Sequence, residues 1–420
     1  MHTSTLILLL TGIIAVLVAL VVFLVWRMAR KDDELRLKNR VIVDEVERRH
    51  RVIDRAVSLG VNRAALLLSF PLLLVIAACT KEGDTIYQPD PADAASTAPL
   101  VTVIYDPNAL GDGGYNDLIY QGVEQAIREH GLRTMQLSPT SYDEGRGYLE
   151  SMFQTVKSQA DTIRRLFIVC AAGYDDYIRQ NSHLFDSNPN ADLLYLETTE
   201  PLASGGSTLY LPYYGAMYEA GAIQPVFNES ATLIISNPED QTVVGAGKGF
   251  TDGFYTDYYR IEYDSLEQSW GFTWEKNLQT IYLAEHTGEG YNIDETTAFQ
   301  VLNECEYTII PICGGSGYTL MYLCEIASSH GYVGIDVENE SCTMSILKHI
   351  DRAVGLCIGQ WLSPEGMPKH QVLGLKEGYT GVALHLRDYR LEQYNKYIPE
   401  TLRQQIHEDA VRKEADYESK

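Results

Sequence analysis

The chain has 420 residues, with 57 acidic and 33 basic side chains and a formal net charge of -24 at pH 7. Nucleic acids and anionic membrane surfaces attract basic proteins, so this charge makes nucleic acid an unexpected partner. The chain is too long for one small core and allows two lobes of ordinary domain size.

The first apolar segment, Leu6 to Trp26, contains no charged residue and is long enough to cross a bilayer. Residues 1–30 are therefore predicted to form a transmembrane helix, with the basic residues that follow Trp26 in the cytoplasm. Residues 31–60 are predicted to form a charged juxtamembrane helix with one apolar stripe. A short coiled coil is the alternative.

Residues 61–79 have the pattern of a bacterial lipoprotein signal, because a short apolar run ends in Ala77, Ala78 and Cys79. Cys79 would carry the acyl chains. A second short transmembrane helix is the alternative, and a start of translation at Val61 would make this segment an ordinary signal peptide. Residues 80–99 predict a flexible linker. We expect an anchored protein of the bacterial cell envelope, with its main domain outside the cytoplasm.

From residue 100 onward, short apolar runs alternate with amphipathic helical patterns. The predicted strands are 100–105, 166–170, 193–196, 232–235, 280–283, 308–312 and 332–335. Several are apolar throughout, as in parallel strands that helices cover on both faces. The predicted fold class is α/β, with doubly wound parallel sheets. Ligands bind beyond the carboxyl ends of such strands, so the loops there are the candidate sites.

The loop after the first strand is rich in glycine and opens a helix. Asp112, Tyr115 and Asn116 offer an acid, an aromatic face and an amide, which together suit a polar ring compound. The alternatives are structural, with Asn116 as a helix cap and Asp112 serving the glycine turn.

Two later loops carry further candidates. Gly314, Gly315 and Ser316 follow the strand at 308–312, and backbone amides there can face a ligand oxygen. Asp336 follows the strand at 332–335, where a carboxylate can accept two hydrogen bonds from a sugar diol. Capping of the next helix is the alternative. No metal cluster or Ser-His-acid spacing is visible, so we expect no enzyme; a nucleoside or sugar hydrolase is the alternative.

In this order the segments resemble the basic membrane protein family of periplasmic binding lipoproteins, which includes purine nucleoside receptors. The matching motifs are Asp112 to Asn116, Phe250 to Phe254, Gly314 to Gly317, Gly334 to Asp336, a helix containing Ser345 and Lys348, and Gly374 to Gly378. The family's G-G-M-D is replaced by Ser236 to Glu239, and its doubled first-loop Asp is single. A small polar ligand is therefore better supported than a purine nucleoside in particular.

The resemblance implies a role for each matching residue. Tyr115 and Phe250 would stack on the two faces of a base, and Asn116 would bond its edge. Sugar hydroxyls would be held by Asp336, Lys348 and the amides of Gly314, Gly315 and Ser316; Asp112, Tyr174 and Asp175 would add polar or base contacts. Core packing is the alternative for Phe250, and a solvent-exposed helix lysine is the alternative for Lys348.

The resemblance also implies two hinged lobes of the type I periplasmic binding fold. We expect one lobe at 100–230 with a return at 344–370, the other at 231–343 with 371–400, and a charged helix at 401–420. The expected function is capture of a small polar ligand, with a nucleoside as first candidate, and delivery to an ABC permease and ATPase. A membrane sensor is the alternative partner.

Overall fold

The structure, a computed structural model, describes residues 97–107, 109–111, 113–158, 163–170, 172–258, 275–287, 293–306, 308–327, 330–386 and 389–419. The predicted transmembrane helix, the juxtamembrane helix, the lipoprotein signal with Cys79, and Asp112 all lie outside these residues. Among the residues described, no helix is both long enough and apolar enough to span a membrane.

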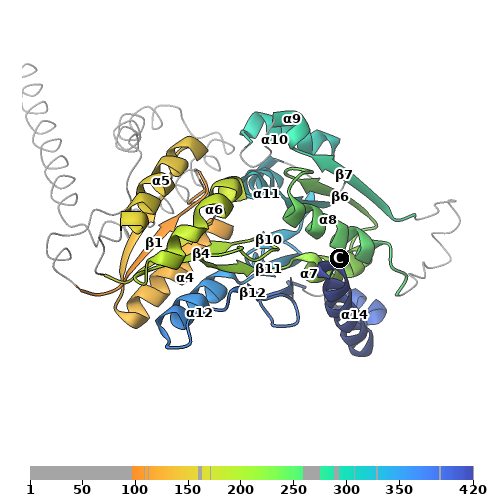
Figure 1. Cartoon of the computed structure of the whole chain (residues 1–420). Helices are drawn as coiled ribbons and strands as arrows, with labels where there is room; N and C mark the ends of the chain where they lie inside the picture. Colours follow the sequence, from red (N-terminus) through yellow and green to blue (C-terminus); the bar gives the residue numbers. More distant parts are fainter. Residues whose placement is uncertain are drawn as a thin grey trace, which may run out of the picture. The chain divides into compact units, whose positions relative to one another are not determined.

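The first lobe is built on a six-stranded parallel sheet of order β12-β5-β4-β3-β1-β2. Its strands are β1 (Leu100–Ile104), β2 (Arg133–Leu137), β3 (Arg165–Val169), β4 (Ala191–Leu196), β5 (Ser207–Tyr210) and β12 (His370–Val372). One face packs on α4 (Tyr115–His130) and α12 (Ile350–Leu362), the other on α5 (Tyr142–Ser158) and α6 (Asp175–Asn181) (Figure 1). Successive residues of β3 enter these two cores in turn, which explains its apolar sequence.

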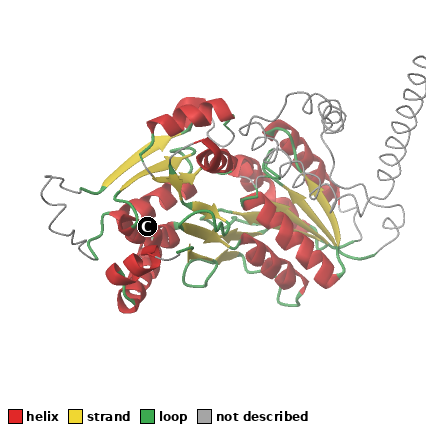
Figure 2. Cartoon of the chain, turned by 180° about the vertical axis from the view of Figure 1, so that it is seen from behind, coloured by secondary structure: helices red, strands yellow, loops and turns green. Residues whose placement is uncertain are grey.

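The second lobe has a four-stranded parallel sheet of order β7-β6-β8-β9. Its strands are β6 (Ser230–Ile235), β7 (Asn277–Tyr282), β8 (Thr308–Ile312) and β9 (Gly331–Tyr332). Helices α7 (Tyr214–Ile223) and α8 (Gln241–Phe254) pack on one face, and α10 (Glu295–Glu304) and α11 (Gly315–Ala327) on the other (Figure 2). Short elements are α9 (Ala284–Thr287), η2 (Ala172–Tyr174), η3 (Ser182–Ser187) and η4 (Gln224–Val226).

A small mixed sheet lies where the chain passes between the lobes. It contains β10 (Gly334–Asp336), β11 (Met344–Lys348) and β13 (Thr380–Leu384), with β11 parallel to β10 and antiparallel to β13. The crossing segments at 211–213, 348–350 and 373–379 are bonded to their neighbours. Leu373 N donates to Tyr210 O at 2.9 Å, and His349 N donates to Tyr379 O at 2.7 Å.

The chain ends in α13 (Tyr389–Tyr397) and α14 (Glu400–Glu418). The helix predicted at 401–420 is therefore present, and it packs on α7. The Glu414 side chain is 5% exposed and accepts hydrogen bonds from Gly215 N at 2.7 Å and Leu375 N at 2.9 Å. Gly215 follows one crossing segment and Leu375 lies within another, so these bonds attach α14 to the connection between the lobes.

The α/β class with parallel sheets is confirmed, but the predicted lobe boundaries differ from those observed. The chain leaves the first lobe at 211–213 rather than at 230, because α7 packs closely on α8 of the second lobe. Residues 370–372 remain in the first lobe, because β12 pairs with β5. The segment from Ser345 to Lys348, predicted as helix, is instead strand β11, whose residues pair with both β10 and β13.

Helices α7 and α8 approach closely because glycines line their contact. A Cβ added at Gly253 would overlap the carbonyl oxygen of Tyr218 in α7. We expect Gly253→Ala to lower the free energy of unfolding by about 1–3 kcal/mol, because the helices must move apart. Gly355→Ala in α12 is the control: its Cβ meets nothing within 4 Å, and it should stabilise by up to about 1 kcal/mol. Equal urea midpoints for the two variants would contradict this packing.

Candidate functional site

Five side chains from separate elements meet where the lobes join. Tyr115 begins α4, Glu197 follows β4, Tyr213 lies in the first crossing segment, and Asp336 and Lys348 end β10 and β11. We call these residues the central cluster. Each lies at the end of a strand or in the segment that follows one, so the alternation of strand and helix gathers them at one place.

Lys348 lies at the centre of this cluster. Its Nζ is 2.9 Å from Glu197 Oε2, and the two side chains are only 7% and 12% exposed. The same ammonium lies 5.5 Å from the ring centroid of Tyr115 and 5.0 Å from that of Tyr213, within the range of cation–π attraction. Tyr213 OH donates to Ile346 O at 2.7 Å and accepts from Asp336 N at 3.1 Å. The cluster therefore ties the first lobe to the small sheet.

The backbone of the cluster is strained. Among the residues described, the non-glycine residues with positive φ are Glu197 at 55° and Asp336 at 66°. Each such conformation costs about 1–3 kcal/mol and persists only where the surroundings enforce it, which happens most often at functional sites. That both occur in one cluster indicates a functional site there.

Several polar atoms near the strand ends are buried without a hydrogen-bond partner. In the first lobe these are Tyr115 OH, Asn116 Oδ1 and Glu197 Oε1; in the second lobe Ser236 Oγ, which follows β6, is another. A buried polar atom left unpaired costs about 1–3 kcal/mol. A ligand with matching polar groups would recover this energy.

The cluster contains two carboxyl groups and one ammonium group. Burial raises the pKa of both Glu197 and Asp336, while the Lys348 ammonium opposes the rise in each. The charge of Asp336 raises the pKa of Glu197 further. Burial, followed by the Glu197 charge, keeps the pKa of Tyr115 well above its usual value, so Tyr115 stays a neutral hydroxyl.

Two more acids extend this charge across the lobes. Asp106 follows β1 and accepts a hydrogen bond from Tyr142 OH at 2.7 Å. Asp240 caps α8 in the second lobe, where its Oδ1 accepts from Thr242 N at 2.9 Å. Burial raises the pKa of Asp106, Tyr142 lowers it, and the charge of Asp240 raises it. The acids of the two lobes are thus close enough to repel each other.

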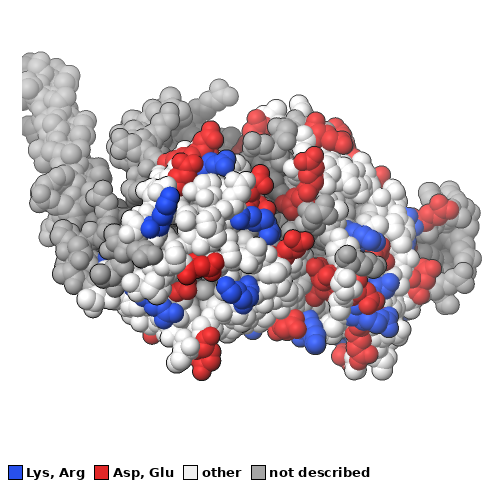
Figure 3. Space-filling model, in the orientation of Figure 1, with Lys and Arg blue, Asp and Glu red and all other residues white. Residues whose placement is uncertain are grey.

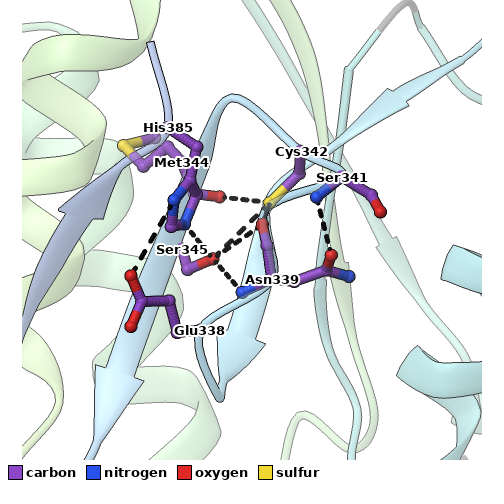
Figure 4. A network of polar contacts seen from close by, with 7 residues as sticks. All are labelled: Glu338, Asn339, Ser341, Cys342, Met344, Ser345 and His385. Atoms are coloured by element: carbon purple, nitrogen blue, oxygen red, sulfur yellow. Dashed lines mark hydrogen bonds and ion pairs between the residues drawn. The ribbon is translucent and has the colours of Figure 1, made fainter.

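A polar network fixes the loop that follows Asp336 (Figure 4). Asn339 N donates to Ser345 Oγ at 2.9 Å, and Ser345 Oγ lies 3.0 Å from His385 Nε2. Glu338 Oε1 is 3.9 Å from His385 Nδ1. The set contains the residue types of a Ser-His-acid triad, but Ser345 is 0% exposed. Its hydroxyl is enclosed, so the network positions the loop rather than presenting a nucleophile.

The glycine turn before α4 is held by Asp117, in the role that the sequence suggests for Asp112. Asp117 Oδ1 accepts from Gly111 N at 2.9 Å and Oδ2 accepts from Gly113 N at 2.7 Å. This fixes the start of α4 and with it Tyr115 and Asn116. Asn116 is 7% exposed, and the N-cap residue of α4 is Gly114, which has no side chain to cap the helix.

The structure brings three of the predicted residues, Tyr115, Asp336 and Lys348, into the central cluster. The alternative for Lys348 was wrong, because it is a strand residue with a 7% exposed side chain and not an exposed helix lysine. Phe250 is 0% exposed and stacks on Phe254 at 6.1 Å in the core under α8. Its position favours packing, and stacking on a ligand stays a prediction.

The other predicted residues have structural partners. Tyr174 is 2% exposed, and its ring packs edge-on against Tyr142 at 5.5 Å, while its buried hydroxyl has no hydrogen-bond partner. Asp175 pairs with Arg179, Nε to Oδ2 at 2.8 Å. At the start of α11, Ser316 Oγ accepts from Ile293 N at 3.1 Å, while Gly315 opens the helix and Gly314 before it has φ of 52°. Their ligand roles stay predictions.

Sequence reasoning missed Glu197, Tyr213 and Asp106. Glu197 directly follows the strand predicted at 193–196, and Asp106 follows the first strand, so the strand-end rule was sufficient to find both. Tyr213 had no such signal, because the crossing segment that holds it was not predicted.

No protein-family model matches the sequence, and no curated protein does either. The fold is similar to that of a solute-binding protein of an ABC transporter system from Aeropyrum pernix K1, which is 16% identical, with a TM-score of 0.56 over 76% of this chain and 92% of that one. An ABC transporter solute-binding protein from Conexibacter woesei DSM 14684 is 12% identical, with a TM-score of 0.50 over 76% and 97%.

A transcriptional activator of the comK gene from Bacillus halodurans is 14% identical, with a TM-score of 0.51 over 71% of this chain and 95% of that one. At these identities the likeness concerns the fold. The chain therefore has an α/β fold with parallel sheets that is similar to the fold of these three proteins.

Proposed function

We propose that the protein is an extracytoplasmic solute-binding protein that captures a small polar ligand between its lobes and delivers it to an ABC importer. The central cluster carries this proposal. Glu197 and Asp336 hold strained backbone there, and Tyr115 and Glu197 keep buried polar atoms unpaired. Strain and unpaired atoms at strand ends are what a preformed ligand site requires.

The structural neighbours support binding rather than catalysis, since they are solute-binding proteins and a regulator. The family resemblance favours a nucleoside as the ligand. Tyr115 would then supply an aromatic face, worth about 1–3 kcal/mol when a base stacks on it. Asp336 would accept hydrogen bonds from the sugar hydroxyls, and Asn116 would bond the edge of the base.

The proposal includes the membrane anchor. Acylation of Cys79 or the span at residues 1–30 would hold the main domain outside the cytoplasm, close to a permease. Delivery of an incoming solute needs this proximity, because it raises the effective concentration of the loaded protein at the importer.

A ligand sensor is the second candidate, favoured by the similarity to a regulator. In that case the segment at residues 31–60, which the sequence predicts to be helical, would contact a signalling partner instead of a permease. Crosslinking of the full chain in membranes, followed by mass spectrometry of the captured protein, distinguishes the two candidates.

Thermal unfolding of the full chain in detergent, with nucleosides, bases and sugars, tests the proposal. A ligand at 100 times its Kd should add about 2.7 kcal/mol of stability. Asp336→Asn should remove this shift, because it takes away a charged acceptor while Asn tolerates the left-handed backbone. Glu365→Gln, at an exposed position after α12, is the control and should keep it. A shift that persists unchanged in Asp336→Asn would contradict the placement of the site.

A further inference from the structure

The charge of the central cluster limits which solutes can bind there. Two carboxylates, Glu197 and Asp336, share the ammonium of Lys348. Asp240 in the second lobe adds its negative charge to the surroundings of Glu197 and Asp106. Acidic side chains also outweigh basic ones across the face drawn in Figure 3. Carboxyl groups therefore outnumber ammonium groups in the central cluster.

Lys348 is not available to hold an anionic ligand. Its Nζ already lies 2.9 Å from Glu197 Oε2 in a nearly buried pair. A phosphate or carboxylate would have to displace Glu197 and leave that carboxylate buried without its partner, which is strongly unfavourable. Anionic solutes are thus excluded by the residue that would otherwise attract them.

The same surroundings suit a second positive charge. The rings of Tyr115 and Tyr213 already face an ammonium at 5.5 and 5.0 Å, which shows that aromatic faces and carboxylates here hold such a group. Glu197 Oε1 and Asn116 Oδ1 are buried acceptors without a donor, and Asn116 is 7% exposed. These atoms call for N–H or O–H donors from the ligand.

We propose that the central cluster selects a solute that carries a protonated amine beside its hydroxyl groups and rejects the phosphorylated or carboxylated counterpart. This inference rests on the solute-binding function proposed above and narrows its ligand to one charge class. The amine would lie between Glu197 and Asp336, donating to Glu197 Oε1 while the Lys348 pair stays intact.

Two series of compounds of similar shape and different charge test this selection by thermal unfolding and calorimetric titration of the full chain. One series is glucosamine, glucose and glucuronate; the other is 5′-amino-5′-deoxyadenosine, adenosine and adenosine 5′-monophosphate. We expect the amine of at least one series to bind about tenfold or more tightly than its hydroxyl analogue, and the anions not to bind, given the strength of charge-assisted hydrogen bonds.

The same titrations on the variant Glu197→Gln provide a second test. This substitution removes the carboxylate that pairs with Lys348 and leaves Asp336 as the other acid near the ammonium, so the preference for the amine should disappear and the anionic member should gain affinity. Glu365→Gln is the exposed control and should behave as the unaltered protein. A hydroxyl analogue that binds as tightly as its amine, or an anion that binds the unaltered protein, overturns the inference and leaves solute binding in place. If none of the six compounds binds, both proposals are contradicted.

Discussion

Lys348→Met is expected to lower the free energy of unfolding by about 3–5 kcal/mol at neutral pH. The Lys348 side chain is 7% exposed and pairs with Glu197, which is 12% exposed. Methionine matches the length of the lysine stem but leaves Glu197 and Asp336 without a positive charge nearby. Removal of one member of a buried ion pair is costly because the remaining charge stays desolvated. Chemical unfolding at pH 7.5 measures the loss.

The loss should depend on pH. Burial already raises the pKa of Glu197 and Asp336, and removal of Lys348 raises both further. A raised pKa in the folded state means that stability is greatest at low pH and falls as pH rises through that pKa. The destabilisation should therefore shrink below pH 5. The double variant Lys348→Met with Glu197→Gln should recover part of it, and additive losses would contradict the pairing.

Glu414→Ala is expected to cost about 2–4 kcal/mol, because it leaves the buried N–H groups of Gly215 and Leu375 without an acceptor. These groups donate to the two carboxylate oxygens at 2.7 and 2.9 Å. Glu408→Ala, an exposed position on the same helix, is the control and should change stability by less than about 0.5 kcal/mol. A loss no larger than that of the control would contradict the docking of α14.

The charge of Glu414 adds a second signature. Burial raises its pKa to about 7, against the bonds from Leu375 and Gly215. The stabilising contribution of this group is full below its unfolded value near 4.5 and is lost as pH rises toward 7. Glu414→Gln cannot titrate, so its stability should fall less between pH 5 and pH 8. The difference from the unaltered chain should be on the order of 2–3 kcal/mol.

The strands that sequence patterns predicted well are apolar throughout and lie in the middle of a sheet, such as β3 and β8. The strands β2 and β11 were missed because their sequences mix polar and apolar residues. β11 also contains Ser345 and Lys348, whose spacing suits a helix equally well. Pairing with β10 and β13, which no local pattern encodes, decides its conformation.

The candidate site was predictable where it follows a strand and not where it depends on tertiary packing. Asp336 and Tyr115 follow that rule, and the structure places both in the central cluster. Phe250 shows the limit of the rule. Gly253 and Gly221 allow α7 and α8 to pack closely, and this packing buries the ring. The motif around Phe250 does not indicate this burial. Tyr213 joins the cluster only because the chain crosses between the lobes beside it.

Hydrogen–deuterium exchange of the full chain, with and without the solute that gives the largest thermal shift, tests most directly whether the lobes close on a ligand at the central cluster. We expect the ligand to slow exchange at amides near Tyr115, Glu197 and Asp336, and also near Asp240 in the second lobe. Protection confined to one lobe, or to amides away from these residues, would contradict binding between the lobes.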